Sequence, residues 1–145
     1  MNTDVEIRSA HAGDAEQVAA LIRQLGYAME PDTLRVKLTQ LATSGADQVF
    51  VAESEGRLLG CLGLHAVPLL HAEGTLGRLT TLVVDEAHRG RGIGHALVMA
   101  AHAWFKAAGC TRFEVTSGDH RERAHRFYER LGYLRQGQRL TMVAA

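Results

Sequence analysis

The sequence predicts an α/β (α+β) fold with one mixed, mainly antiparallel central sheet flanked by about four helices. Three observations lead to this prediction. Short β-rich runs at residues 48–53, 57–67 and 75–84 follow one another with turn signals between them, which is typical of an antiparallel meander. Amphipathic runs of helical period lie on both sides of this meander. A strand, a glycine-rich turn, a long helix and a strand then follow in order up to residue 116, and such a βαβ crossover requires a parallel strand pair.

Two helices are predicted before the meander. Residues 4–8 alternate as a short strand, and the run 15–25 then places Val18, Leu21 and Leu25 on one helical face before Gly26 ends it. A second helix is expected from Pro31, whose ring suits the first turn of a helix, to about residue 44.

The later elements are delimited mostly by glycines. Glu55-Gly56 is the turn signal between the first two strands of the meander, and Gly109 ends a helix over 93–108. A strand at 111–116 and a helix over about 119–131, closed by Gly132, follow. The apolar pattern after that helix predicts a final strand from Tyr133 to Val143.

Length and composition indicate a single domain over residues 1–145. The chain has 16 Lys and Arg against 16 Asp and Glu, and 46% of its residues are hydrophobic. These values are typical of a globular protein with one core and exclude a disordered chain. The net charge of zero argues against a nucleic-acid partner bound through many phosphate contacts.

The cysteines, the start of the chain and the histidines allow three further expectations. Cys61 and Cys110 are isolated, which favours free thiols and a cytoplasmic protein. No secretory signal or membrane span is visible, so we expect no membrane partner. The eight histidines lack metal-ligand spacing, so we expect no metal.

The glycine-rich turn runs from Arg89 to His95 and reads RGRGIGH. Closely spaced glycines let a backbone approach a ligand, and the helix that follows presents unpaired N–H groups and the positive end of its dipole. The two arginines of the turn add donors that suit phosphate oxygens. A dinucleotide fingerprint fails because residue 95 is His95, and a phosphate-loop motif fails because its Lys is missing. The remaining interpretations are a site for another phosphate ligand and a tight structural turn.

Two motifs resemble those of the GNAT superfamily of acetyl-CoA-dependent N-acetyltransferases. Arg89 to Gly94 match the pattern [RQ]-x-x-G-x-[GA], and Ala124 to Tyr133 match A-x-x-F-Y-x-x-x-G-[FY]. The resemblance implies that the strand at 75–84 splays from the strand at 111–116 and leaves a cleft for acetyl-CoA. It further implies a set of cofactor-binding residues, namely Leu82, Val83 and Val84 through their backbone, Arg89, Gly90, Arg91, Gly92, Ile93, Gly94 and His95 around the pyrophosphate, and Ser117 and Arg121 before the last helix. Arg121 stands where many members carry an Asn, and Ser117 caps the helix or contacts pantetheine.

The resemblance also implies an acetyl transfer from acetyl-CoA to a primary amine by direct attack in a ternary complex. Tyr128 is then the expected general acid, since a phenol with a pKa of about 10 can protonate a departing thiolate. The carboxylate that many members carry on the strand at 75–84 is missing. Candidates for the general base are Glu73, Glu114, the three histidines His65, His71 and His120, and water.

Several alternatives remain open from the sequence. The acceptor is expected to be a small molecule or a protein terminus, bound between residues 26–33 and 65–74, and the donor can be acetyl-CoA or a longer acyl-CoA. A non-catalytic acyl-CoA-binding sensor or interaction module is the alternative function, which the missing carboxylate favours. The apolar residues 140–143 allow a homodimer as well as a monomer.

Overall fold

Five strands form one sheet in the order in which they occur along the chain. The computed structural model describes residues 4–116, 122–137 and 139–144. Its elements are β1 (Glu6–Ser9), α1 (Ala15–Gln24), α2 (Pro31–Ala42), β2 (Asp47–Ser54), β3 (Arg57–Pro68), β4 (Thr75–Val84), α3 (Ile93–Ala107), β5 (Cys110–Val115) and α4 (Glu122–Arg130), with 3₁₀ turns η1 (Ala12–Asp14) and η2 (Glu86–His88). The predicted strands at 4–8, 48–53, 57–67, 75–84 and 111–116 and the two N-terminal helices are therefore confirmed, with small shifts of their ends.

The sheet is mixed and mainly antiparallel, as predicted. The pairs β1–β2, β2–β3 and β3–β4 are antiparallel, whereas β4 and β5, which α3 connects, are parallel. The β2–β3 turn is made by Glu55 at φ 51° and Gly56 at φ 78°. Two consecutive positive φ angles match the twist of antiparallel strands, which explains the tight hairpin at this position.

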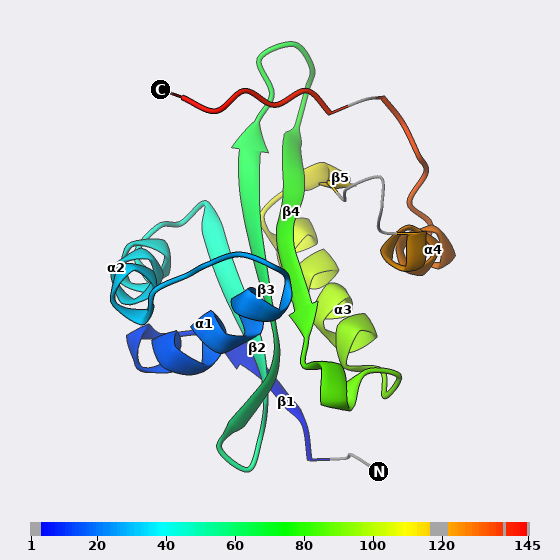
Figure 1. The fold of residues 1–145 in the computed structure, drawn as a ribbon. Coiled ribbons are helices and arrows are strands. Elements are labelled where there is room, and N and C mark those ends of the chain that lie inside the picture. The colour runs from blue at the N-terminus through cyan, green and yellow to red at the C-terminus, as the bar shows by residue number, and fades with distance from the viewer. Residues whose placement is uncertain (1–3, 117–121, 138, 145) are drawn as a thin grey trace.

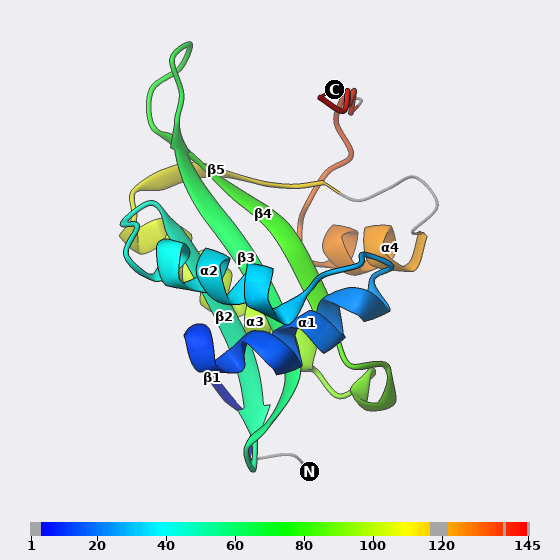
Figure 2. The ribbon, with the colours of Figure 1, turned by 60° about the vertical axis from the view of Figure 1, so that its left-hand side comes forward.

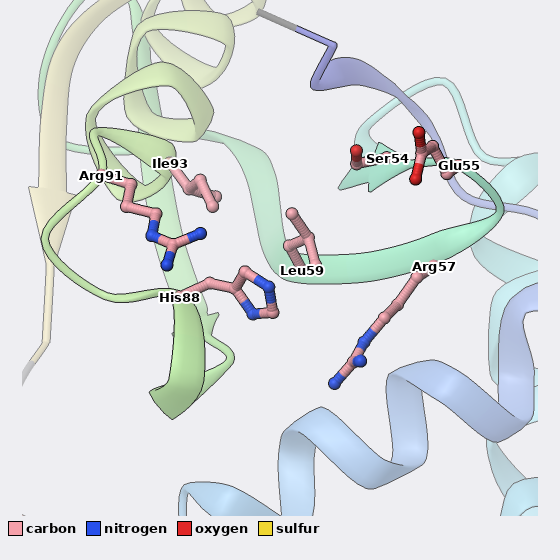
Figure 3. A pocket seen from close by; sticks show the side chains of 7 residues that line it. All are labelled: Ser54, Glu55, Arg57, Leu59, His88, Arg91 and Ile93. Carbon is pink, nitrogen blue, oxygen red and sulfur yellow. The ribbon is translucent and has the colours of Figure 1, made fainter. Parts of the chain in front are cut away.

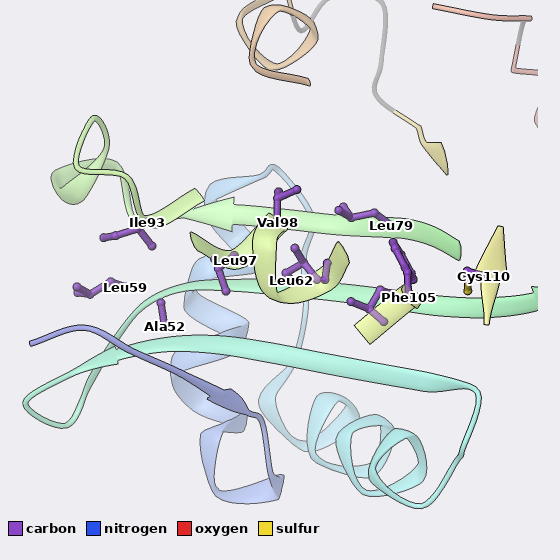
Figure 4. Close-up of a cluster of buried hydrophobic side chains, with 11 residues drawn as sticks. Ala52, Leu59, Leu62, Leu79, Ile93, Leu97, Val98, Phe105 and Cys110 are labelled. Atoms are coloured by element: carbon purple, nitrogen blue, oxygen red, sulfur yellow. The ribbon is translucent and has the colours of Figure 1, made fainter. Parts of the chain in front are cut away.

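Helices cover both faces of the sheet (Figures 1 and 2). On one face, the side chains of α3 form a buried cluster with β3 and β4, which includes Leu62, Leu79 and Phe105 (Figure 4). On the other face, α1 and α2 pack against the sheet through a second cluster that includes Val18, Leu38 and Val83. The sheet thus separates an α3 face from an α1/α2 face.

The β4 and β5 strands separate halfway along β4. Their last paired residues are Leu79 and Val115, and β4 continues to Val84 without β5 beside it. The α4 helix lies on this side of the molecule (Figure 1). The splay between β4 and β5, expected only from the family resemblance, is present.

The predicted final strand from Tyr133 to Val143 is wrong. The described residues after Leu131 form no strand, and Leu140, Met142 and Val143 are exposed. Gly137 interrupts the run with a left-handed backbone at φ 69°. An alternating pattern becomes a strand only where it pairs with another strand, and within the described residues this segment pairs with none.

Candidate active site

The glycine-rich turn connects η2 to α3 and exposes the first amides of that helix. Gly90 and Gly92 have φ angles of 81° and 82°, and Gly92 is the N-cap of α3. Ala96 N donates to Gly92 O at 3.0 Å, so the amides of residues 93–95 precede the first intrahelical hydrogen bond. A Cβ atom at either glycine would meet no atom within 4 Å. The turn therefore presents three helix-terminal N–H groups and an open approach, which suits an anion.

The two arginines of this turn have different surroundings. Arg89 Nε donates to the carbonyl oxygen of Val84 at 3.3 Å, which ties the turn to the end of β4. Arg91 instead lines a cavity of about 280 Å³ together with Ser54, Glu55, Arg57, Leu59, His88 and Ile93 (Figure 3). This cavity lies beside the β2–β3 turn and not between β4 and β5, so it is separate from the splay.

The residues at the end of β4 pack their side chains on both faces of the sheet, and only Val83 is fully buried. Leu82 and Val84 pack against the α3 cluster, and Val83 lies in the α1/α2 cluster. Because the ladder to β5 has ended at Leu79, the backbone of these residues on that side has no partner strand within the described residues. Free backbone groups of this kind can pair with an extended amide-containing ligand.

The two sequence motifs meet in space at Gly94. A methyl group there would lie 3.6 Å from Phe127 Cζ of α4 and 3.6 Å from Val84 Cγ2 of β4. Tyr128, next to Phe127, is only 8% exposed, and its ring lies 5.2 Å from that of Phe127 and 5.6 Å from that of Tyr133. The end of β4, the first turn of α3 and the helix that carries Tyr128 thus form one corner of the molecule.

Tyr133 holds the end of α4 to α3. Its hydroxyl lies 2.8 Å from His102 Nε2, and the His102 ring stacks on Phe113 of β5 at 5.0 Å. Burial raises the pKa of Tyr133 to about 12 and lowers the pKa of His102, so the pair is neutral at pH 7. Its function is to position α4.

Asp85, at the end of β4, is a buried carboxylate that sequence reasoning did not single out. It accepts from Gln24 Nε2 at 3.0 Å and Arg57 Nη2 at 3.3 Å, and His88 Nδ1 lies 2.8 Å from it. These bonds, that from Gln24 first, lower the pKa of Asp85. Three segments far apart in the sequence, those of Gln24, Arg57 and Asp85 with His88, are joined here beside the glycine-rich turn, and no local sequence pattern could have indicated this.

The candidate bases from the sequence have different surroundings. Glu114 is paired with Arg78 at 3.0 Å, while Glu73 and His71 are exposed in the turn between β3 and β4. His65 is half-buried and hydrogen-bonded to Asp47 and Thr80.

Some predicted site residues lie outside the described part of the chain, namely Ser117, His120 and Arg121. Within the described residues, no three His, Cys, Asp or Glu side chains are placed to hold a metal ion, and both cysteines are buried free thiols. No helix of the described chain is long and apolar enough to cross a membrane.

Comparison with known proteins gives one consistent result. Residues 15–133 match the model of the acetyltransferase (GNAT) family. An aminoalkylphosphonate N-acetyltransferase of Salmonella typhimurium is 30% identical, over 94% of this chain and 89% of its own length. A glucosamine 6-phosphate N-acetyltransferase of Trypanosoma brucei brucei is 29% identical, over 90% of this chain and 89% of its own length. Among solved structures, a transcriptional regulator from Bacillus halodurans has a TM-score of 0.87 with 27% identity, covering 97% of this chain and 99% of its own. An aminoglycoside N-acetyltransferase in complex with CoA has a TM-score of 0.85, at 16% identity and coverages of 97% and 94%.

Proposed function

The chain belongs to the acetyltransferase (GNAT) family and is an acyl-CoA-dependent acetyltransferase, and from this premise we propose that it transfers an acetyl group from acetyl-CoA to a primary amine of a small molecule. One observation carries the proposal. The open edge of β4, the amides at the start of α3 and Tyr128 of α4 meet in the corner around Gly94. A cofactor with a phosphate end and a thioester end needs an anion-binding group for the first and a proton donor for the second, with a backbone edge between them.

We propose that acetyl-CoA lies along the splay. The backbone of Leu82, Val83 and Val84 would pair with pantetheine, and the amides of residues 91–95 would bind the pyrophosphate. Gly90 and Gly92 would shape the turn, and Arg89 would fix it to β4. We place Ser117 and Arg121 on the same cofactor. A protein of the same fold has been solved in complex with CoA, which supports CoA as the cofactor.

In the proposed reaction, the amine attacks the thioester carbonyl directly within a ternary complex. A C–N bond forms, the C–S bond breaks, and the departing thiolate takes a proton from the hydroxyl of Tyr128. A phenol suits this role because it is un-ionised at neutral pH yet acidic enough to protonate a thiolate. The burial of Tyr128 supports the assignment, since excluding water strengthens a proton donor at a developing charge.

The acceptor is proposed to approach from the α1/α2 face, between the α1–α2 connection and the β3–β4 turn. Three relatives suggest its class by their names. One is named a glucosamine 6-phosphate N-acetyltransferase, one a probable enzyme of that kind and one an aminoalkylphosphonate N-acetyltransferase, and these substrates all combine an amine with a phosphorus-centred anion. A small amine that carries such an anion is therefore the first acceptor to test.

The experiment is an assay of thiol release from acetyl-CoA with a panel of amines. The panel contains glucosamine 6-phosphate, 2-aminoethylphosphonate, an aminoglycoside and a peptide with a free N-terminus. We expect turnover with at least one small amine and more slowly with propionyl-CoA. Tight CoA binding without turnover of any amine would overturn the proposal and favour an acyl-CoA-binding module.

We also propose that the chain forms a homodimer. Leu140, Met142 and Val143 are 91%, 92% and 86% exposed, an unusual state for three large apolar side chains so close in sequence. In the described part of the chain, β5 is an edge strand. A second copy of the chain would cover both features.

A further inference from the structure

Three side chains on neighbouring strands form a hydrogen-bonded row that ends at the splay. His65 Nδ1 lies 2.6 Å from Asp47 Oδ1, and His65 Nε2 lies 2.9 Å from Thr80 Oγ1. Asp47 opens β2 and is the register partner of His65 on β3, while Thr80 belongs to β4. The row therefore crosses the sheet from β2 through β3 to β4. We refer to it as the Asp47–His65–Thr80 row.

The direction of its hydrogen bonds follows from the charge of Asp47. Hydrogen bonds from the Ser44 hydroxyl and from His65 lower the pKa of Asp47, so its carboxylate is ionised and can only accept. The proton of a neutral His65 therefore sits on Nδ1, and Nε2 is an acceptor. The Thr80 hydroxyl donates to Nε2 at 2.9 Å in preference to the Gly63 carbonyl at 3.4 Å. The oxygen of Thr80 keeps lone pairs for a donor outside the row.

Thr80 lies where β4 leaves β5. Leu79 is the last residue of β4 paired with β5, and Thr80 is the extra residue of a β-bulge, because Leu79 and Thr81 pair with adjacent residues of β3. Bulges redirect a side chain and occur frequently next to active sites. The side chain of Thr80 is exposed.

The row is on the α1/α2 face of the sheet. A Cβ atom at Gly63 would lie 3.7 Å from Thr80 Oγ1, and Cys61, two residues earlier on β3, belongs to the α1/α2 cluster. Residues two apart on a strand point to the same face. This is the face from which the acceptor is proposed to approach.

We propose that the Asp47–His65–Thr80 row removes the proton of the acceptor amine. As the C–N bond forms and the C–S bond breaks, the amine proton passes to Thr80 Oγ1 while the proton of that hydroxyl passes to His65 Nε2. The resulting imidazolium is stabilised by the Asp47 carboxylate. Tyr128 protonates the thiolate, and after product release His65 loses its proton to water and Tyr128 regains one from water. This inference rests on the proposed function.

The charges around His65 are compatible with this role. Asp47 faces it from β2, Ser44 reaches Asp47 from the turn after α2, and Arg78 is its register partner on β4. The guanidinium of Arg78 is itself paired with Glu114 at 3.0 Å. The imidazolium thus meets one carboxylate directly, while Arg78 faces Glu114, which also lies 3.6 Å from Arg112.

The test compares two substitutions at Thr80 in acetyl transfer to the best amine of the panel. Thr80→Val removes the hydroxyl at nearly constant shape and is expected to lower kcat about 100-fold, the lower end of general-base effects, with the KM for acetyl-CoA unchanged. Thr80→Ser keeps the hydroxyl and is expected to stay near the wild-type rate. Thr39→Val is the matched control, since among the described residues the Thr39 hydroxyl donates to Arg35 O of its own helix.

The pH profile supplies a measurement that a purely structural row would not change. The wild-type rate is expected to fall at acid pH beyond the fall caused by protonation of the amine, because the row can take the amine proton only while His65 Nε2 carries none. In His65→Gln, most of kcat is expected to be lost, and this additional fall in rate at acid pH is expected to disappear. The fall caused by protonation of the amine should remain.

The possible results separate the two proposals. Equal kcat values for Thr80→Val, Thr80→Ser and wild type would overturn the row and leave the acetyl transfer standing. Absence of turnover in the wild type would overturn both. An NMR measurement of the His65 tautomer needs no acceptor amine. A spectrum that shows the proton of neutral His65 on Nε2 would overturn the proposed role of the row.

Discussion

Tyr128 is the residue on which the proposed proton delivery depends, and its substitution gives the first prediction. Tyr128→Phe keeps the ring contacts with Phe127 and Tyr133 but removes the hydroxyl. We expect kcat to fall by about 10²-fold or more, because a positioned general acid typically contributes that much. The dissociation constant of CoA, measured by calorimetry, should stay within a few-fold.

Tyr133→Phe is the matched control for this prediction. Its hydroxyl bonds to His102 and has a structural role, so its loss should cost roughly 1 kcal/mol of unfolding free energy with little effect on kcat. The opposite pattern, with Tyr133 controlling kcat and Tyr128 only stability, would remove Tyr128 from the mechanism.

At the scale of elements, the turn before α3 yields the second prediction. Gly92→Ala forces an L-residue to φ 82° at the N-cap, and Gly109→Ala imposes a φ of 81° beyond the other end of the same helix. Both sites are open, so both variants should lose stability by roughly 1 kcal/mol from backbone strain. Only Gly92→Ala should also weaken CoA binding, because it disturbs the amides.

Calorimetric titration with CoA and urea unfolding measure the two effects separately. Equal CoA affinity in the two variants would mean that the turn binds no phosphate.

The junction at Asp85 gives the third prediction. Asp85→Asn exchanges an ionised acceptor for an amide in a buried site and should lower the free energy of unfolding at pH 7 by about 1–3 kcal/mol. Since the folded-state pKa of Asp85 is lowered, its contribution is complete above the unfolded pKa of about 4 and is lost as pH falls through the folded value.

Urea unfolding at several pH values checks both statements. The wild type should lose more stability than Asp85→Asn on acidification below pH ~4. Asp32→Asn is the control, because that side chain is 96% exposed and its ion pair with Arg35 contributes little. A variant as acid-sensitive as the wild type would contradict the assignment.

The elements also show what the sequence could and could not predict. The β2–β3 hairpin and the start of α3 follow from local glycine signals, so they were predictable. The Asp47–His65 pair depends on strand register, and the Asp85 junction depends on tertiary packing that brings Gln24 to β4. The prediction of a final strand was wrong because an alternating pattern carries no information about which strand it would pair with. The predicted cofactor residues came from motifs, and their contacts stay predictions.

At the scale of the whole molecule, the exposed C-terminal side chains yield the fourth prediction. A protein that carries both Leu140→Ser and Met142→Ser should sediment as a monomer, whereas the wild type should sediment as a dimer, because the substitutions remove the apolar surface that a second copy would cover. Sedimentation velocity over a dilution series measures this. A wild type that is monomeric at every concentration would contradict the homodimer.

The short ladder between β4 and β5 also affects how the molecule opens. Five register pairs hold β5 to the sheet, whereas the β2–β3–β4 meander is paired along nearly its whole length. Local opening requires less free energy where fewer hydrogen bonds and packed side chains must separate. We therefore expect the amides of β5 to exchange with solvent faster than those of β3. The strand that borders the proposed cofactor cleft can then move aside to admit a ligand while the rest of the sheet stays folded.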